Sequence, residues 1–243
     1  MSAWLDADHC LVIAHRGASM TAPENTLAAF RLALEQGADG IELDVRRTRD
    51  GHLVVIHDAT LERVAGKPGE VSALPLETLR GLDIGSGERI PTLAEVLALA
   101  KTHLLVDIEL KVAGIEPVVL DLVREAGMEP QVLITSFLED AVAAVRQAAP
   151  HVPAGLLQQW PAPERARALG VPVYLPNIGM LSGDLMAACR RTHLRVIPWT
   201  IRREDEAVAA VRLGVAGIIA DDPRLARSAL ARAEEEGTAW RNR

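Results

Sequence analysis

The sequence predicts an α/β fold, a TIM (β/α)8 barrel in a single domain, and three observations support it. Short apolar runs alternate with helical patterns between about residues 11 and 220, as βα repeats around a parallel sheet do. Apart from one hairpin arm, these runs give eight strands, and the 243 residues are close to the roughly 250 of such barrels. No G-x-G-x-x-G motif or P-loop is present, which disfavours the alternative of an open doubly wound sheet. Residues 1–243 are therefore expected to form one domain.

The first βα unit is predicted from an apolar run and a capped helical pattern. Leu11–Ala14 is the expected strand, and a helix follows over Leu27–Gln36. Asn25 or Thr26 can accept hydrogen bonds from the first N–H groups of this helix, and Gly37 suits its end. The loop that joins the strand to the helix therefore lies at the carboxyl end of the strand.

Residues Gly40–Asp58 are predicted to form a β-hairpin that contains the second strand. Asp50-Gly51 is a strong signal for a two-residue hairpin turn. The residue pairs expected from such a turn are Thr48 with Leu53, Arg46 with Val55, and Asp44 with His57. This register brings a histidine to the carboxylates of the second strand.

The strand and helix rhythm is lost over about residues 59–89, where we expect a small insertion at the barrel mouth. Thr92 then caps a helix in the segment TLAEVLALA. The strands expected after it are Leu104–Lys111, Val132–Phe137, Ala154–Leu157, Val173–Leu175, Val196–Thr200 and Ile218–Ala220. The helices expected between them are Ile115–Ala126, Leu138–Ala148, Pro163–Leu169, Gly183–Arg191 and Glu204–Leu213.

The composition limits the partners and the compartment. A net charge of −7 and a pI near 5.5 disfavour nucleic acid or an anionic membrane surface, because either would need a basic field. There is no run of about twenty apolar residues that would predict a membrane span. Cys10 and Cys189 suit buried positions in a reducing compartment, and the N-terminal residues do not resemble a secretory leader. We therefore expect a cytoplasmic protein without stable membrane association.

Three carboxylates are predicted to converge at the carboxyl ends of two strands, where barrel enzymes carry their active sites. Residues two apart in a strand share a face, so Glu42 projects with Asp44, and Asp107 projects with Glu109. Glu42, Asp44 and Glu109 would repel one another unless a cation lay between them. Oxygen ligands favour a hard divalent ion, Mg²⁺ or Ca²⁺. Asp107 lies deeper, and a structural hydrogen bond is the better interpretation of its role.

Other ionisable residues fall at the ends of predicted strands. His15 and Arg16 follow the first strand and offer an acid/base group beside a donor for phosphate or carboxylate. His57 ends the return arm of the hairpin, near the same carboxylates. Lys111 ends a further strand and is either a solvated lysine or a compact positive charge directed at a ligand.

The sequence leaves the roles of three further residues open. Glu24 lies in Pro23-Glu24-Asn25-Thr26, which is either a simple helix start or a loop that leans into the barrel mouth. Trp199 is either the wall of a binding site or part of the core. Phe137 is interpreted as a core residue.

An ordered set of short motifs covers nearly the whole chain. The motifs are AHRG at 14–17, PENT at 23–26, IELDV at 41–45, VIHD at 55–58, IPTLAEVL at 90–97, IELK at 108–111, TSF at 135–137, PWT at 198–200 and GIIADDP at 217–223. With these motifs in this order, the chain resembles the glycerophosphodiester phosphodiesterase family, and within it the cytoplasmic bacterial type.

The resemblance implies a metal-dependent phosphodiesterase built on a TIM barrel. The residues that it assigns to one divalent cation, Mg²⁺ or Ca²⁺, are Glu42, Asp44 and Glu109. The residues that it assigns to acid/base catalysis are His15 and His57, and those assigned to the phosphate are Arg16 and Lys111. Glu24 and Trp199 are further candidates for substrate contacts. The implied reaction is hydrolysis of small glycerophosphodiesters, such as glycerophosphocholine and glycerophosphoethanolamine, to sn-glycerol 3-phosphate and an alcohol.

The last third of the chain departs from the family's pattern. Trp199-Thr200-Ile201-Arg202 stands where W-T-V-N is common, which leaves the preferred head group open. The alternative functions are a lysophospholipase D, a metal-dependent isomerase or lyase with Lys111 as base, and a barrel that binds phosphoesters without turnover. Barrels of this kind can also pair, so a homodimer is one expected oligomeric state.

Overall fold

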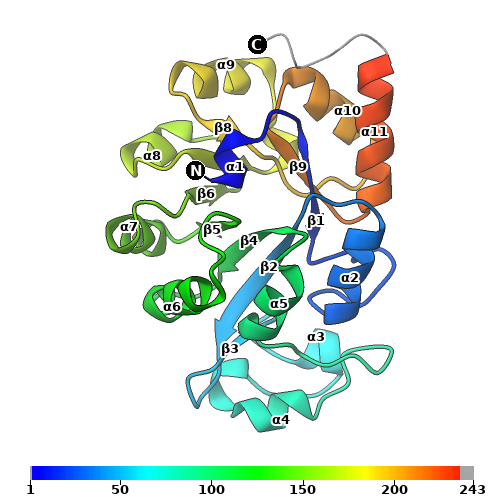
Figure 1. The fold of residues 1–243 in the computed structure, drawn as a ribbon, viewed down its shortest axis with the longest axis vertical. Helices are drawn as coiled ribbons and strands as arrows, with labels where there is room; N and C mark the ends of the chain where they lie inside the picture. The colour runs from blue at the N-terminus through cyan, green and yellow to red at the C-terminus, as the bar shows by residue number, and fades with distance from the viewer. Residues whose placement is uncertain (1, 236–243) are drawn as a thin grey trace.

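The computed structural model describes residues 2–235, which form a barrel of eight parallel strands (Figure 1). The strands of the barrel are β1 Leu11–His15, β2 Gly40–Arg47, β4 Leu105–Leu110, β5 Val132–Ser136, β6 Ala154–Gln158, β7 Val173–Pro176, β8 Arg195–Val196 and β9 Gly217–Ala220. Neighbouring strands pair in the order β8-β7-β6-β5-β4-β2-β1-β9. The predicted TIM barrel is therefore confirmed.

The two ends of the sheet meet between β8 and β9. A parallel bridge joins Ile201 to Ala220, and the Ile201 N–H donates to the Ile219 carbonyl at 2.8 Å. β8 is shorter than the predicted strand Val196–Thr200, although the N–H groups of Ile197 and Trp199 still donate to the Tyr174 and Pro176 carbonyls of β7 at 3.0 and 3.1 Å. The segment after β8 nevertheless reaches the rim and completes the ring there.

Helices cover the outside of the barrel, as the alternating pattern predicts (Figure 1). These are α2 Leu27–Glu35, α5 Leu93–Ala100, α6 Glu116–Ala126, α7 Glu139–Ala148, α8 Pro163–Ala168, α9 Gly183–Arg191 and α10 Glu204–Leu213, with the 3-10 turn η2 Ile178–Met180. The hydroxyl of Thr26 accepts a hydrogen bond from the Ala29 N–H at 3.1 Å, so Thr26 rather than Asn25 caps α2. A further helix, α11 Pro223–Glu235, lies outside the predicted elements and packs against α10.

A separate apolar cluster fills the inside of the barrel. Its buried residues are Trp4, Leu11, Ile13, Leu133, Leu157, Val173, Leu175, Ile197 and Ile219. The short helix α1 Ala3–Asp6 brings Trp4 to the amino ends of the strands, where its indole N–H donates to the Gln131 carbonyl at 2.8 Å. Side chains therefore fill the barrel at the amino ends of its strands, and its open end is the carboxyl end.

The hairpin after β2 is present, but the predicted register is wrong by one residue. β3 Leu53–Val55 pairs antiparallel with β2, and Arg46 lies opposite Val54 rather than Val55. Gly51 has φ of +89°, a left-handed conformation that ends a three-residue hairpin loop instead of the two-residue turn expected from Asp50-Gly51. His57 therefore lies beyond β3 and is not the strand partner of Asp44.

The segment between β3 and α5, where an insertion at the barrel mouth was predicted, forms short helices and turns (Figure 1). It contains α3 Glu62–Ala65, the 3-10 turn η1 Val71–Ala73 and α4 Leu76–Arg80. A small apolar cluster of its own holds it together, with buried residues Val54, Ile56, Leu61, Val71, Leu79, Leu82 and Ile90. Because Val54 belongs to β3 and Ile56 follows it, the insertion is fixed directly to the hairpin.

The cysteines and the helices bear on two expectations from the composition, namely buried thiols and the lack of a membrane span. Cys10 and Cys189 are both buried and both free, as expected for small apolar side chains in a core. Among the helices of residues 2–235, none combines the length and the apolar character that crossing a membrane requires.

Candidate active site

The carboxyl ends of β1, β2 and β4 place four ionisable side chains beside one another. In the strand registers, His15 lies opposite Glu42, and Asp44 lies opposite Glu109. Because β2 pairs with both β1 and β4, the four residues form one patch at the rim. This is the end at which barrels of this fold carry their active sites.

Glu42, Asp44 and Glu109 form a buried carboxylate cluster. One oxygen atom from each residue lies within 4.8 Å of the other two, and the residues are 5%, 1% and 8% exposed. Burial and repulsion from Asp44 raise the pKa of Glu42 well above its ordinary value and that of Glu109 to about 7. Burial also acts to raise the pKa of Asp44, but the nearby Arg16 and Lys111 outweigh it and lower that pKa. Of the three carboxylates, only Asp44 has a lowered pKa.

Two cationic side chains contact this carboxylate cluster. The Lys111 ammonium lies 2.6 Å from Glu109 Oε1 and 3.3 Å from Asp44 Oδ1. Arg16 Nε lies 3.2 Å from Asp44 Oδ2, and the Arg16 backbone N–H donates to Glu42 at 3.1 Å. Both cationic side chains are largely buried, so solvent screens these attractions only weakly. Lys111 is therefore a compact charge inside the site rather than a solvated lysine.

The carboxylate cluster fits a divalent cation. All of its donor atoms are carboxylate oxygens, which hard ions such as Mg²⁺ and Ca²⁺ prefer. Asp44 Oδ1 is buried and accepts no hydrogen bond from the described residues. A divalent ion would offset the repulsion that raises the pKa values of Glu42 and Glu109. Within residues 2–235, no other group of three metal-binding side chains converges in this way.

His15 is oriented by a carboxylate from the far end of the chain. Its Nδ1 lies 2.5 Å from Asp221 Oδ1, and Asp221 Oδ2 accepts a hydrogen bond from Arg202 Nε at 2.9 Å. Although burial opposes it, these two partners hold the pKa of Asp221 below its ordinary value. If Nδ1–H is donated to Asp221, Nε2 keeps its lone pair, and it lies 3.9 Å from Glu42 Oε2. Arg202, a departure from the family's pattern, thus supports the histidine's partner.

His57 is held by an equivalent pair of residues from the insertion side. Its Nδ1 lies 2.6 Å from Asp58 Oδ1, and Arg63 Nε donates to Asp58 Oδ2 at 2.6 Å. The hydrogen bond from Arg63 is the main reason that the pKa of Asp58 falls to about 2. Burial lowers the pKa of His57 itself, which favours its neutral form. In both histidines, a carboxylate therefore contacts Nδ1.

Glu24 joins two arginines. It accepts hydrogen bonds from Arg16 at 3.0 Å and from Arg63 at 2.7 and 2.9 Å. Burial would raise the pKa of Glu24, but the bonds from Arg63 and the charge of Arg16 lower it. The Glu24 carboxylate therefore positions Arg16 and ties it to α3. Direct contact between Glu24 and a substrate stays a prediction.

A cavity of about 260 Å³ opens beside these groups. The predicted site residues that line it are His15, Arg16, Glu42, His57, Glu109, Lys111 and Trp199, while Asp44 lies buried behind them. The Trp199 ring is fixed by its N–H, which donates to the Leu175 carbonyl at 2.7 Å. It packs edge-to-face on Phe137, with ring centres 5.3 Å apart. Together the two rings form an apolar wall opposite a strongly polar one.

The interpretation of Phe137 as a core residue is wrong. Phe137 is 42% exposed and lines the cavity. The reason is local, because β5 ends at Ser136 and the chain leaves the sheet with the next residue. Asp107, by contrast, is buried and accepts a hydrogen bond from the Thr135 hydroxyl at 2.7 Å, with burial raising its pKa to about 8. That contact agrees with the structural role expected for Asp107.

Three supporting residues are absent from the sequence-based set, namely Asp58, Arg63 and Asp221. Asp221 directly follows β9, so the strand-end rule that indicates His15 would also have indicated it. Asp58 follows His57 in the chain and could have been included as its partner. Arg63 has one partner nearby in the chain, Asp58, but its contact with Glu24 joins residues 39 positions apart, and no local pattern indicates it.

Comparison with known proteins relates this site to one family. The sequence profile of the glycerophosphoryl diester phosphodiesterase family matches residues 15–225. A glycerophosphodiester phosphodiesterase from Caldanaerobacter subterraneus is 41% identical over 232 residues, covering 88% of this chain and 94% of that protein. The match thus includes the cavity, the carboxylate cluster and both histidines.

Two solved structures share the fold. A phosphodiesterase from Oleispira antarctica, in complex with the product sn-glycerol-3-phosphate, has a TM-score of 0.86 and 28% identity, covering 91% of this chain and 96% of that one. A glycerophosphodiester phosphodiesterase from Agrobacterium tumefaciens has a TM-score of 0.81 and 29% identity, covering 90% of this chain and 100% of that one. The chain therefore belongs to the glycerophosphoryl diester phosphodiesterase family.

Proposed function

We propose that this protein hydrolyses glycerophosphodiesters to sn-glycerol 3-phosphate and an alcohol. The observation that carries the proposal is the pair of carboxylate-oriented histidines, His15 and His57, at one cavity beside three carboxylates. Relatives of the same family support the reaction class, and the Oleispira antarctica phosphodiesterase was solved with sn-glycerol-3-phosphate as its product. Glycerophosphocholine and glycerophosphoethanolamine are the proposed test substrates.

Arg16 and Lys111 are proposed to bind the phosphoryl oxygens. Both line the cavity and both already contact the carboxylate cluster, so their charges are fixed before a substrate arrives. Positive groups held in place stabilise the charge that builds on phosphoryl oxygens in the transition state. The guanidinium can bond two oxygens at once, whereas the ammonium acts as a point charge.

Glu42, Asp44 and Glu109 are proposed to hold one divalent cation, Mg²⁺ or Ca²⁺. When bound, such an ion supplies a further positive charge for the phosphoryl group. The carboxylates also keep His15 and Lys111 in the neighbourhood of that group, through the contacts to Glu42 and Glu109. Metal dependence is thus part of the proposal.

The two histidines are proposed to move the protons of the reaction. Nε2 of one takes the proton from the attacking hydroxyl, and N–H of the other gives a proton to the oxygen of the departing alcohol. The P–O bond to that alcohol breaks as the bond to the attacking oxygen forms. The attacking oxygen is that of water, or that of the glycerol 2-hydroxyl by way of a cyclic phosphate. Detection of cyclic phosphate during turnover distinguishes the two routes.

The test measures sn-glycerol 3-phosphate released from glycerophosphocholine and glycerophosphoethanolamine, with Mg²⁺, with Ca²⁺ and with EDTA. We expect release that EDTA abolishes and that one of the two ions restores. Release that continues at full rate in excess EDTA would remove the metal from the proposal. Choline release from lysophosphatidylcholine, with no activity on either glycerophosphodiester, would favour a lysophospholipase D instead.

A further inference from the structure

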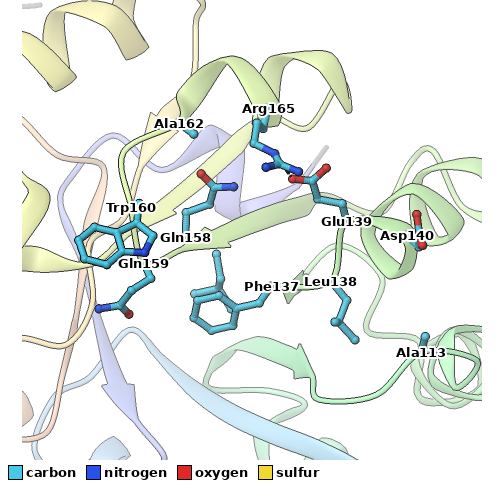
Figure 2. A pocket seen from close by; sticks show the side chains of 11 residues that line it. Ala113, Phe137, Leu138, Glu139, Asp140, Gln158, Gln159, Trp160, Ala162 and Arg165 are labelled. Atoms are coloured by element: carbon cyan, nitrogen blue, oxygen red, sulfur yellow. Dashed lines mark ion pairs between the residues drawn. The ribbon is translucent and has the colours of Figure 1, made fainter.

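A second hollow adjoins the active-site cavity at the carboxyl ends of β5 and β6 (Figure 2). It has a volume of about 590 Å³, and two of its lining residues, Phe137 and Leu157, also line the cavity. We call this hollow the side groove. Because Phe137 and Leu157 border both spaces, the side groove directly adjoins the active-site cavity.

The side groove presents large apolar side chains to water. Trp160 is 71% exposed, and Phe137 and Leu138 are 42% and 41% exposed. Figure 2 shows these three side chains bordering the same hollow. Single exposed apolar residues are ordinary, but several on one hollow beside a reaction site indicate a binding surface.

The charged side chains of the side groove do not offer a free charge next to the aromatic rings. Glu139 forms an ion pair with Arg165 at one edge, marked by the dashed line in Figure 2. Asp140 lies on α7 at the outer edge of the view, away from Trp160. The remaining polar side chains near the rings, Gln158 and Gln159, are neutral. The lining therefore suits an uncharged apolar group better than a cation.

We propose that the side groove binds an apolar, uncharged alcohol substituent of the phosphodiester, and that Trp160 and Leu138 determine this preference. The inference rests on the proposed phosphodiesterase function and specifies its substrate class. The active-site cavity, about 260 Å³, is smaller than the ~300–1,000 Å³ of typical ligand pockets, and the side groove adds about 590 Å³. The phosphoryl group lies at Arg16 and Lys111, and the substituent crosses Phe137 into the side groove.

The first test compares diesters of sn-glycerol 3-phosphate that differ only in the alcohol. The alcohols are methanol, butanol, hexanol, choline and 3,3-dimethylbutanol, which is a neutral isostere of choline. We expect kcat/KM to rise with each methylene by up to about fourfold, the equivalent of ~0.8 kcal/mol. We also expect the dimethylbutyl diester to be preferred over the choline diester. A flat series, or preference for choline, overturns the inference.

The second test uses variants. Trp160→Ala should reduce the ratio of kcat/KM between the hexyl and methyl diesters, because it removes apolar surface that only the longer alcohol reaches. Val118→Ala, at a residue 41% exposed on α6, is the matched control and should leave that ratio as in the wild type. Thermal unfolding confirms that both variants fold. An equal loss for both diesters in Trp160→Ala would mean a structural role and would overturn the assignment.

A third measurement does not need turnover. Titration calorimetry with methyl phosphate and hexyl phosphate reports whether the alkyl chain contributes to binding. We expect the wild type, and not Trp160→Ala, to bind hexyl phosphate several-fold more tightly. Tighter binding of hexyl phosphate, without hydrolysis of any diester, would refute the proposed function but support an apolar binding site in the side groove. Hydrolysis of the diesters, with equal binding of methyl phosphate and hexyl phosphate, would support the function and refute that binding site.

Discussion

At the scale of single residues, each histidine of the site is the first member of a chain of contacts. His15 is bonded to Asp221, which Arg202 holds, and His57 is bonded to Asp58, which Arg63 holds. An arginine that keeps the carboxylate ionised also keeps it available as an acceptor for Nδ1–H. In each ring, the carboxylate that holds Nδ1 thus sets which nitrogen stays available for other contacts.

His15→Ala and His57→Ala should each lower kcat by about 10²–10⁴-fold, since a positioned acid/base group contributes that much. Steady-state hydrolysis of glycerophosphocholine measures the effect. Both side chains lie at the cavity rather than in the apolar core, so thermal unfolding should change little. Near-normal kcat in either variant would disprove the scheme with two histidines.

Asp221→Asn should lower kcat by at least about tenfold, because the amide carries no charge to hold the His15 N–H. Asp222→Asn is the matched control, since Asp222 accepts bonds from Arg224 and does not contact His15. Equal kcat in the two variants would mean that Asp221 does not orient His15. Asp221→Asn should have little effect on KM, which distinguishes a role in orienting His15 from a role in substrate binding.

At the scale of elements, the insertion does more than cover part of the barrel. Arg63 on α3 donates to Asp58 and to Glu24, so one side chain holds the partner of His57 and the partner of Arg16. No residue of the short helix α3 is fully buried, although Val64 and Ala65 pack against the insertion's apolar cluster. The hydrogen bonds of Arg63 add a direct connection from this helix to the site.

Arg63→Met should lower kcat by about tenfold, because small displacements of His57 and Arg16 misalign the reacting groups. The cost in unfolding free energy should stay below about 1 kcal/mol, since Arg63 is 47% exposed. Arg80→Met is the matched control, because Arg80 also lies in the insertion, is 46% exposed and pairs with Glu95 away from the site. A loss of stability without a loss of kcat would contradict this role.

The hairpin loop carries a pH-sensitive contact. Hydrogen bonds from the Thr48 hydroxyl and the Leu76 N–H lower the pKa of Asp50 to about 2, against about 3.9 in an unfolded chain. A lowered folded-state pKa stabilises the protein above the unfolded value and loses that effect as pH falls towards 2. The difference in unfolding free energy between wild type and Asp50→Asn should therefore shrink from pH 5 to pH 2.5. Denaturant unfolding at both values measures it, and a constant difference would contradict the assignment.

The elements show what could be predicted from the sequence and what could not. The alternation of side chains in β2 and β4 was enough to place Glu42, Asp44 and Glu109 together, because strand parity is fixed by backbone geometry. The hairpin register could not be predicted in the same way, because Gly51 allows either a two-residue or a three-residue loop. Contacts such as Arg63 with Glu24 depend on how distant elements pack, and no local pattern encodes them.

At the scale of the whole molecule, the carboxylate cluster is a source of instability without a cation. A divalent ion at about 100 times its Kd would add ~2.7 kcal/mol. For a chain of this size that corresponds to a rise in Tm of about 5–10 °C. Thermal unfolding with EDTA, Mg²⁺ and Ca²⁺ measures this rise.

Glu42→Gln should abolish the rise in Tm, because it removes one ligand charge from the carboxylate cluster. Glu95→Gln is the control, since Glu95 lies on α5 and takes part in its capping box, outside the carboxylate cluster. An equal rise in wild type and Glu42→Gln would place the stabilising ion elsewhere on the protein.

The contact between His15 and Asp221 joins residues 206 positions apart, across the neighbouring strands β1 and β9. Arg202, which also holds Asp221, comes from the segment that completes the ring. During synthesis, His15 leaves the ribosome early, and nearly the whole barrel is synthesised before its partner Asp221. A chain interrupted before β9 would carry most of the site and still lack an oriented His15. Recovery of enzymatic rate after refolding would therefore time the closing of the ring, while circular dichroism would record the helices that form before it.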